Sequence, residues 1–338
     1  MKATLFTFEE CDAATGGFAP SRLLGGATYR GVLRGSPVAV TQLPAHACQA
    51  AAAGALDADT RLLASLAQAS SARHPCLSPL VGVSVSGVDF SAPGRANTRP
   101  PCLVHELVAS GSLRRALAAH TPRLPPHALV RVVADAASAL AALHEAGACH
   151  GRVSSSRVFI LHAPRRVNGD AARAPVTGRL AGGGLPSEVC VALWLASSPS
   201  SSAPSRRLPP EWDVMASRVV TPATDVFALG CVLSELLSPS PLPHEASGWA
   251  ERDALYRTAL ADVASRCTAD APEDRPASAE VAAALRRVER ALLRARPPPP
   301  PRIPLPARLS AAVGAIRRAP ATRRPGAPGG GGGGGAAS

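Results

Sequence analysis

The sequence predicts an α+β fold in which strands come first and helices follow. Two apolar runs, at 23–33 and 38–40, flank the turn-forming residues RGS at 34–36, which is typical of a β-hairpin. Beyond residue 125 the chain shows long stretches with apolar residues at helical spacing. From residue 296 to the end Pro, Arg and Gly dominate, and a segment of that composition cannot bury a core. The tail is therefore expected to be disordered.

Four helices can be placed from the pattern of apolar residues. An Ala-rich amphipathic stretch predicts a helix at about 50–68. A longer helix is predicted at 125–146, where one stripe holds Leu129, Val133, Ala136 and Leu140 and where Gly147 supplies a usual stop. The last two helices are expected at 252–267 and 278–293. The Ser- and Pro-rich stretch 196–210 between them and the long helix is predicted to be an exposed loop.

The formal charge of +12 is concentrated at the end of the chain. Eleven Arg and one Glu lie from Arg286 onward, so this end holds +10 and the rest of the chain is near neutral. Lys2 is the only lysine among 36 basic residues. A solvated basic tail is the plainer reading, and a site for nucleic acid or an acidic membrane is the alternative.

Cysteine spacing and hydropathy set the expected compartment. The eight Cys are widely separated and form no C-x-x-C, so reduced thiols are expected rather than a zinc cluster or a disulfide framework. The first residues lack the apolar core of a signal peptide, and no run of 18 apolar residues occurs. We expect a cytoplasmic protein without a transmembrane segment.

Several short motifs follow one another in the order in which protein kinases carry them. FTFEECDAATGGF at 6–18 resembles the lead-in of plant receptor-like kinases, and CLVHELVASGSL at 102–113 resembles the hinge between kinase lobes. LPPEW at 208–212 and DVFALG at 225–230 resemble the end of the activation segment and the buried helix that follows it. DRP at 274–276 supplies the family's late arginine. The chain thus resembles the protein kinase domain of plant receptor-like kinases (Pelle/interleukin-receptor-associated kinase type) over residues 6–293.

This resemblance implies a bilobal protein kinase-like fold. Its small, mostly β N-lobe would span 1–108 with the lead-in segment, its larger, mostly α C-lobe 109–295, and the tail 296–338. The shortened segment 24–31 and VTP at 220–222 look most like a LysM-receptor subgroup with degenerate kinase domains.

Three residues keep the roles that the family gives them in holding the fold together. The resemblance implies that Glu211 pairs with Arg275 and that Asp225 accepts hydrogen bonds from the backbone of the catalytic loop. Losing one member of a buried ion pair is strongly destabilising, and this chain keeps both.

The resemblance also implies that the N-lobe lacks the groups that bind the nucleotide phosphates in the family. The glycine loop at Gly25 and Gly26 is shortened, so a tight phosphate cover is not expected. Thr41 stands where V-A-V-K has its lysine, and threonine carries no charge. Asp59 matches the glutamate that pairs with that lysine in the family.

By the same resemblance, the catalytic loop has lost the residues that act in phosphate transfer. HGRVSSSR at 150–157 matches H-R-D-x-K-x-x-N, so Arg152 replaces the catalytic base, Ser154 the supporting lysine and Arg157 the metal-binding asparagine. Alignment on Leu180-Ala181 places Thr177 at the metal-binding aspartate of D-F-G. Arginine stays protonated at physiological pH and cannot accept a proton from a substrate hydroxyl. The resemblance therefore implies no catalytic residue and no metal ligand.

No cofactor is expected, and ATP binding without strong dependence on magnesium stays open. A bound nucleotide would lie against five residues by resemblance, namely Gly25, Gly26, Ala39, Glu106 and Val108. Arg152, Arg157 and Arg179 can together form a cationic floor for a phosphorylated peptide or a carboxylate of the chain itself. The plainer alternative is that these arginines are solvated or pair with local acids.

The resemblance points to a catalytically inactive scaffold or regulator in receptor-like kinase signalling. Its expected partner is an active receptor-like kinase, and it would lie in the cytoplasm or peripherally at the plasma membrane. One alternative is a diverged serine/threonine kinase that retains ATP binding. A second is a binder of nucleic acid or acidic membrane through the tail, whose affinity would depend steeply on salt. The tail has no aromatic residue to stack on bases, which ranks this alternative last.

Overall fold

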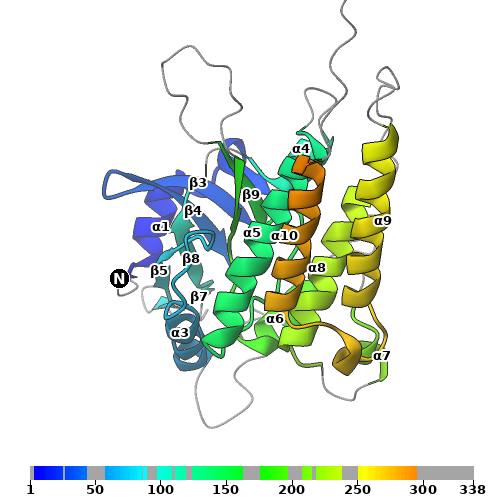
Figure 1. Ribbon diagram of the computed structural model, residues 1–338. Coiled ribbons are helices and arrows are strands. Elements are labelled where there is room, and N and C mark those ends of the chain that lie inside the picture. Colours follow the sequence, from blue (N-terminus) through cyan, green and yellow to red (C-terminus); the bar gives the residue numbers. More distant parts are fainter. Residues whose placement is uncertain are drawn as a thin grey trace, which may run out of the picture. The chain divides into compact units, whose positions relative to one another are not determined.

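The computed structural model describes residues 4–25, 27–43, 58–85, 87–89, 97–108, 111–118, 124–162, 176–196, 208–214, 218–237 and 250–294. The chain divides into two units, Met1–Arg296 and Pro297–Ser338. All described residues belong to the first unit. The tail, Gly26 and the Ser-rich segment 197–205 lie outside the described residues. Figure 1 shows a sheet in the N-terminal part and a set of helices in the C-terminal part, as the α+β prediction requires.

The N-lobe is built on a six-stranded sheet with the order β1-β5-β8-β4-β3-β2. Its strands are β1 (Thr4–Leu5), β2 (Leu23–Gly25), β3 (Thr28–Leu33), β4 (Ser36–Gln42), β5 (Leu80–Ser84) and β8 (Cys102–Glu106). The predicted hairpin is confirmed, because β3 and β4 pair antiparallel up to Leu33 and Ser36. Arg34 and Gly35 both have positive φ, at 50° and 80°, and such two-residue turns match the twist of paired strands.

The residues just before the lead-in at 6–18 form an edge strand of this sheet. Strand β1 pairs parallel with β5, Thr4 beside Gly82. A Cβ on Gly82 would clash with the carbonyl oxygen of Thr4, so only glycine lets the two backbones approach this closely. Helix α1 (Phe8–Thr15) follows, and its first turn is closed by a capping box in which Thr7 and Glu10 each bond the other's backbone N–H.

Helix α3 (Ala58–Ala69) packs against the sheet through Leu62 and Leu66, which are buried with Val83 and Leu103. It covers the second half of the helix predicted at 50–68, and residues 50–57 lie outside the described part. Helix α6 (Ser187–Ala196) joins the same cluster through Val189. The remaining short elements are η1 (Pro20–Arg22), the paired strands β6 (Gly87–Asp89) and β7 (Asn97–Arg99), and α4 (Leu113–Ala118).

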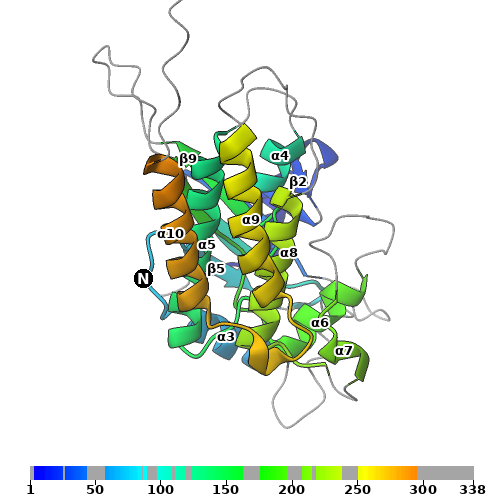
Figure 2. The same ribbon diagram turned by 45° about the vertical axis from the view of Figure 1, so that its right-hand side comes forward.

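The C-lobe core is formed by four helices that run side by side in both views (Figures 1 and 2). They are α5 (Pro126–Glu145), α8 (Pro222–Leu237), α9 (Ala250–Cys267) and α10 (Ser278–Arg294). The helices predicted at 125–146, 252–267 and 278–293 are thereby confirmed to within a few residues. The short helices α7 (Glu211–Val214) and η4 (Pro272–Asp274) lie near one end of this set.

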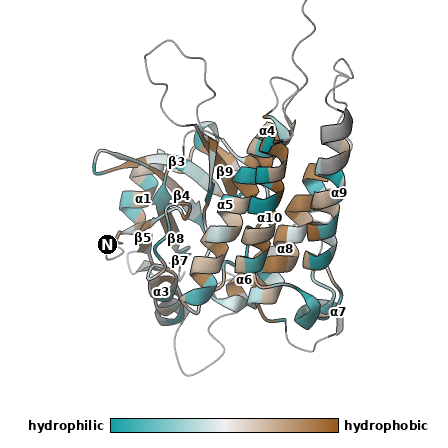
Figure 3. Cartoon of the chain, in the orientation of Figure 1, coloured by the Kyte–Doolittle hydropathy of each residue, from teal (hydrophilic) through white to brown (hydrophobic). Residues whose placement is uncertain are grey.

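Helix α8 lies at the centre of the C-lobe. Eleven of its residues are buried, and Figure 3 shows its mostly apolar colouring. Helix α5 is long and apolar enough to cross a membrane, but two-thirds (67%) of its most apolar window is buried within the protein. Its burial matches that of a core helix, because residues such as Val133 and Leu140 are fully enclosed by neighbouring elements.

Strands β9 (Val158–His162) and β10 (Val176–Leu180) form a hairpin that packs on α5. Gly178 lies so close to α5 that a Cβ there would clash with the carbonyl of Val132. Its N–H donates to the buried carboxylate of Asp135 at 2.7 Å, and Asp135 also pairs with Arg286 of α10. The carboxylate of Asp135 thus connects α5 to both β10 and α10. Residues 150–157 lead directly into β9.

Candidate functional site

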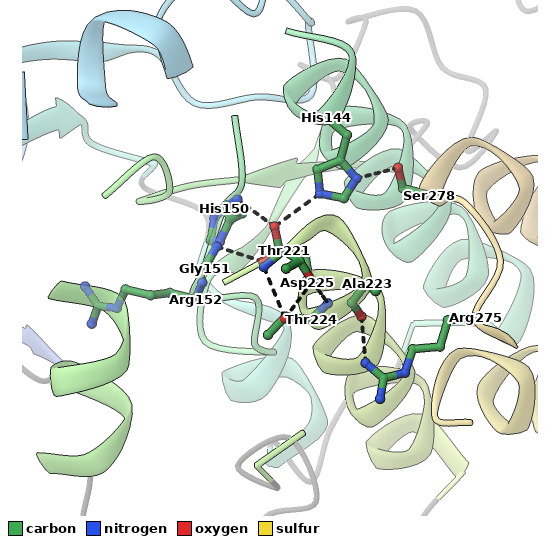
Figure 4. Close-up of polar contacts among 10 residues, drawn as sticks. All are labelled: His144, His150, Gly151, Arg152, Thr221, Ala223, Thr224, Asp225, Arg275 and Ser278. Carbon is green, nitrogen blue, oxygen red and sulfur yellow. Dashed lines mark hydrogen bonds and ion pairs between the residues drawn. The ribbon is translucent and has the colours of Figure 1, made fainter. Parts of the chain in front are cut away.

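Asp225, near the start of α8, holds the segment 150–157 by its backbone. Its Oδ2 accepts from His150 N–H at 2.6 Å and its Oδ1 from Gly151 N–H at 2.7 Å, while the residue is 1% exposed. His144 Nε2 lies 3.1 Å from the same carboxylate, and Figure 4 shows these groups converging on it. Hydrogen bonds to a charged group contribute about 1.5–3 kcal/mol each. The expected role of Asp225 is thus present in the structure.

Gly151 has to be glycine for this loop to close. Its φ is +73°, and a Cβ would clash with Cys190 Sγ of α6. The family carries arginine at this position by the match to H-R-D, so the change from arginine to glycine here accompanies close packing of α6 on the loop.

The ion pair expected between Glu211 and Arg275 is also present. Arg275 donates to both carboxylate oxygens of Glu211, at 2.9 and 2.6 Å, with a guanidinium that is 0% exposed. The remaining donors reach the carbonyls of Ala223, Ala269 and Asp270 at 2.9–3.2 Å. The guanidinium also stacks 4.9 Å from the ring centroid of Phe227. Every part of this cation is therefore satisfied.

Thr41 lies near the end of β4, and no charged group of the described residues pairs with it. It is 4% exposed, and its Oγ1 lies 2.8 Å from Thr28 Oγ1 of the neighbouring strand. Two hydroxyl groups thus satisfy each other where the family has a lysine. Of Asp59 only its place in α3 is described, and Gly25 lies in β2.

Arg152 and Arg157 stand on the anchored loop without an acidic partner. Both are half-buried, and among the described residues no carboxylate pairs with either guanidinium. The charge of Arg152, together with burial, lowers the pKa of Arg157, and burial lowers the pKa of Arg152. Figure 4 shows the Arg152 side chain pointing away from the Asp225 network. Ser154 Oγ lies 2.9 Å from Ser156 Oγ of the same loop.

Thr177 lies on the hairpin that follows this loop. It lies inside β10, paired with Leu161 of β9, and the residue that follows the hairpin next to Arg157 is Gly182. Ala181 N–H donates to the carbonyl of Arg157 at 3.0 Å, and a Cβ on Gly182 would lie 2.5 Å from Arg157 Nη1. Gly182 is thus the residue beside Arg157, whereas Thr177, which the alignment matches to the D-F-G aspartate, lies within β10.

The hinge side carries an ion pair between Arg179 and Glu106. It also holds His105, a buried residue that was not predicted from the sequence. Arg179 donates to Glu106 at 2.9 Å, so this arginine is neutralised by the hinge and does not join a cationic floor. Ala39 pairs with His105 across β4 and β8, and Val108 is buried. His105 is 6% exposed, and neither ring nitrogen has a hydrogen bond within normal geometry.

Both buried histidines of this region are held neutral. Burial, with a smaller effect of Arg157, lowers the pKa of His105 to about 3, although the nearby carbonyl of Pro79 acts in the opposite direction. Burial likewise lowers the pKa of His150 to about 4, against the opposing charge of Asp225. His150 Nε2 lies 3.2 Å from the carbonyl of Ala181, which links the loop to the glycines at 182–184.

One group of potential metal ligands lies nearby but is engaged otherwise. His144, Cys149 and Asp225 have ligand atoms within 4.8 Å of one another. Asp225 already accepts two backbone N–H groups, and His144 Nδ1 lies 2.9 Å from Ser278 Oγ. Burial, and next the charge of Asp225, raises the pKa of the Cys149 thiol to about 12, so the thiol stays protonated. These residues fit a structural hydrogen-bond cluster better than a metal site.

A loop anchored on a buried helix by an aspartate, below a sheet of this order, defines a protein kinase domain. The chain belongs to the protein tyrosine and serine/threonine kinase family, whose model matches residues 55–285, more than half of its length. No curated protein matches the chain by sequence.

Among the solved structures that share the fold are two plant pseudokinases. The apo GRMZM2G135359 pseudokinase has a TM-score of 0.50 and 16% identity, covering 85% of this chain and 97% of its own. Pseudokinase DRIK1 (drought responsive inactive kinase 1), bound to ENMD-2076, has a TM-score of 0.51 and 16% identity, covering 86% and 98%. At this identity the likeness concerns the fold alone.

Proposed function

We propose that this chain is a pseudokinase, a kinase domain that does not transfer phosphate from magnesium-ATP. The observation that carries the proposal is the pair Arg157 and Gly182. In protein kinases the catalytic-loop asparagine and the D-F-G aspartate hold the magnesium ions. Here the first place carries a cation and the second has no side chain, and the guanidinium fills the space that a side chain at Gly182 would need. Magnesium requires oxygen ligands, and a guanidinium repels it.

The base that accepts the proton and the lysine that binds the phosphates are replaced as well. Arg152 stands at the place of the base and cannot accept a proton. Thr41 stands at the place of the lysine and bonds Thr28 instead of a phosphate. Since transfer depends on positioning and neutralising the phosphates, losing all of these groups removes the catalytic means while Asp225 and Arg275 keep the fold.

A retained fold without catalytic groups favours a role in binding other proteins. We propose that the chain is a scaffold or regulator in receptor-like kinase signalling, in the cytoplasm or peripherally at the plasma membrane. The support is the lead-in at 6–18, which resembles that of receptor-like kinases and forms α1 directly after β1. Direct binding of the purified full chain to the kinase domains of active receptor-like kinases tests this. Lack of binding to any such domain would count against the role.

The catalytic part of the proposal is tested with the full chain produced in cells without serine/threonine kinases. Radiolabelled ATP with magnesium or manganese is expected to give no phosphate transfer to the chain or to a generic substrate. Arg157→Ala is assayed beside it, and labelling that disappears on further purification of both proteins comes from a contaminant. Magnesium-dependent transfer by the chain that changes in the variant would instead identify a diverged serine/threonine kinase.

A further inference from the structure

Helices α9 and α10, which lie side by side in both views, border a hollow of about 230 Å³ (Figures 1 and 2). Val263 of α9 and Val281 of α10 line it and are 6% and 1% exposed. Ala283 and Ala284 also line it, and their side chains end at Cβ and leave the space open. Pockets for drug-sized molecules measure about 300–1,000 Å³, so this hollow suits one or two side chains instead.

Two arginines line the same hollow, one from each helix. Arg266 of α9 and Arg287 of α10 are exposed, and neither forms an ion pair with a described residue. Arg290 and Arg294 are exposed too, and their spacing places them on the face of α10 that carries Arg287. A row of positive charge therefore leads away from the hollow along α10.

Glu280 lines the hollow as well, but the helix itself uses its carboxylate. Its Oε2 accepts from Ala277 N–H at 2.9 Å, just before α10 begins. This bond satisfies one of the N–H groups that a helix leaves unpaired at its start. Asp262, the exposed acid next to Val263 on α9, does not line the hollow. Two free guanidinium groups thus face one engaged carboxylate.

The helices that form the hollow are fixed by the C-lobe core. Leu260 of α9 and Leu285 of α10 are fully buried. The first residue of α10, Ser278, has its Oγ 2.9 Å from His144 Nδ1 of α5, and Arg275 shortly before it is held by Glu211. A surface that is already in place loses little freedom when a ligand binds, so more of the interaction energy appears as affinity.

We propose that the hollow between α9 and α10 binds an acidic segment of another protein, with an apolar side chain in the hollow and carboxylates on Arg266 and Arg287. Guanidinium groups bind carboxylates through paired hydrogen bonds, and arginine clusters are a recurring means of recognising acidic peptides. An anionic membrane would meet the protruding arginines as a flat surface and leave the hollow unused, so the hollow favours a peptide.

The inference extends the proposed scaffold role, on which it rests, by naming the chemistry of a partner. The lining residues all lie within 263–287, outside the loop at 150–157 and the N-lobe. It therefore holds whether or not the chain transfers phosphate. The assay below contains no kinase domain, so its failure and a failure of the binding test with receptor-like kinases are distinguishable.

The test measures fluorescence anisotropy of a labelled peptide of Glu and Asp residues around one leucine, titrated with the full chain. The wild type is expected to bind it, less tightly as salt increases. Arg266→Gln/Arg287→Gln is expected to weaken binding about fivefold, since an exposed ion pair contributes up to about this factor. The control Arg114→Gln/Arg115→Gln removes the same charge from exposed positions of α4 and should leave the affinity unchanged. Equal affinities of the two double variants, or no binding by the wild type, would overturn the proposal.

The apolar part of the test separates this site from the basic tail. Ala283→Leu places a larger side chain in the hollow from an exposed position of α10 and should weaken binding of the leucine peptide several-fold. A matched peptide with alanine in place of leucine should bind the wild type more weakly, because less apolar surface is buried. The tail has no such hollow to fill, so equal binding of both peptides by wild type and Ala283→Leu would assign the binding to the tail and overturn the proposal.

Two further measurements decide between the occupants and cover a double variant that does not fold. Vesicles containing anionic lipid are expected to bind the wild type and Ala283→Leu alike. Vesicle binding that is lost in Arg266→Gln/Arg287→Gln while peptide binding stays would assign the arginines to a membrane and overturn the proposal. In the wild type, the peptide is expected to shift the NMR signals of the Ala283 and Ala284 amides, and signals that stay in place at saturation would contradict the placement of the site.

Discussion

The ion pair of Glu211 and Arg275 and the arginines Arg152 and Arg157 lie in the same lobe but follow opposite rules. Arg275 is completely buried and every donor is used. Arg152 and Arg157 are half-buried and have no carboxylate partner among the described residues. The first region stabilises the fold, and in the second the charge of Arg152, together with burial, lowers the pKa of Arg157. The comparison teaches that the structural and the chemical halves of a kinase domain can be separated residue by residue.

Breaking the satisfied pair is expected to have the largest effect. Glu211→Ala leaves the Arg275 guanidinium buried without its anion, which typically costs about 3–5 kcal/mol of unfolding free energy. Urea unfolding followed by circular dichroism measures this. The control Arg34→Gln removes an exposed pair whose side chains are 63% and 37% exposed, and exposed pairs contribute less than about 1 kcal/mol. Equal losses in the two variants would contradict the assigned role of Glu211.

The anchor of the loop comes next in size. Asp225→Asn replaces one of the two acceptors by an N–H₂ group that faces a backbone N–H, and a loss of about 2–3 kcal/mol is expected. Hydrogen exchange at the amides of His150 and Gly151 should become faster than in the wild type. Asp213→Asn, at an exposed position of α7, serves as control and should change neither quantity.

The next prediction concerns how the unfolding free energy depends on pH through His105. The pKa of His105 is about 3 in the folded chain and near 6.5 when unfolded, so the stability it permits is complete above pH 6.5 and falls as pH decreases toward 3. Each such group contributes a slope of about 1.4 kcal/mol per pH unit in that window. His105→Leu is expected to reduce the slope by this amount between pH 6 and 4. Slopes that coincide for wild type and variant would mean that His105 is protonated in the folded chain.

The smallest expected effect is on catalysis. Arg152→Asp/Arg157→Asn restores two family residues, yet no phosphate transfer is expected, because Thr41 and Gly182 still lack the lysine and the second metal ligand. The labelling assay with magnesium-ATP measures this. A clear gain of transfer would show that another group of the chain already replaces those two residues.

The scaffold could be predicted from sequence because its residues lie in short motifs with fixed spacing. Glu211, Asp225 and Arg275 were each identified by immediate neighbours, and the structure brings them to the expected partners. The helices at 125–146, 252–267 and 278–293 were equally accessible because their apolar periodicity is long.

The catalytic positions were harder to predict, because substitution has removed the family residues by which these positions are aligned. The place of Gly182 beside Arg157 could not be predicted, since a run of glycines carries neither the acid nor the aromatic residue of D-F-G. The packing of Arg157 over Gly182 and the unbonded ring of His105 depend on contacts between residues far apart in sequence. Periodicity and spacing hold no information on such contacts.

The parallel pairing of β1 with β5 has a practical consequence. The two residues Thr4 and Leu5 cover the backbone N–H and C=O groups at one edge of the sheet, and Phe6 continues with a bond to Val83. An uncovered edge offers a template to which another chain can add a strand, and proteins protect such edges against aggregation. A preparation trimmed to start at Phe6 would lack β1 and leave β5 open, and self-association of that shortened protein would then be an artefact of trimming rather than a property of the molecule.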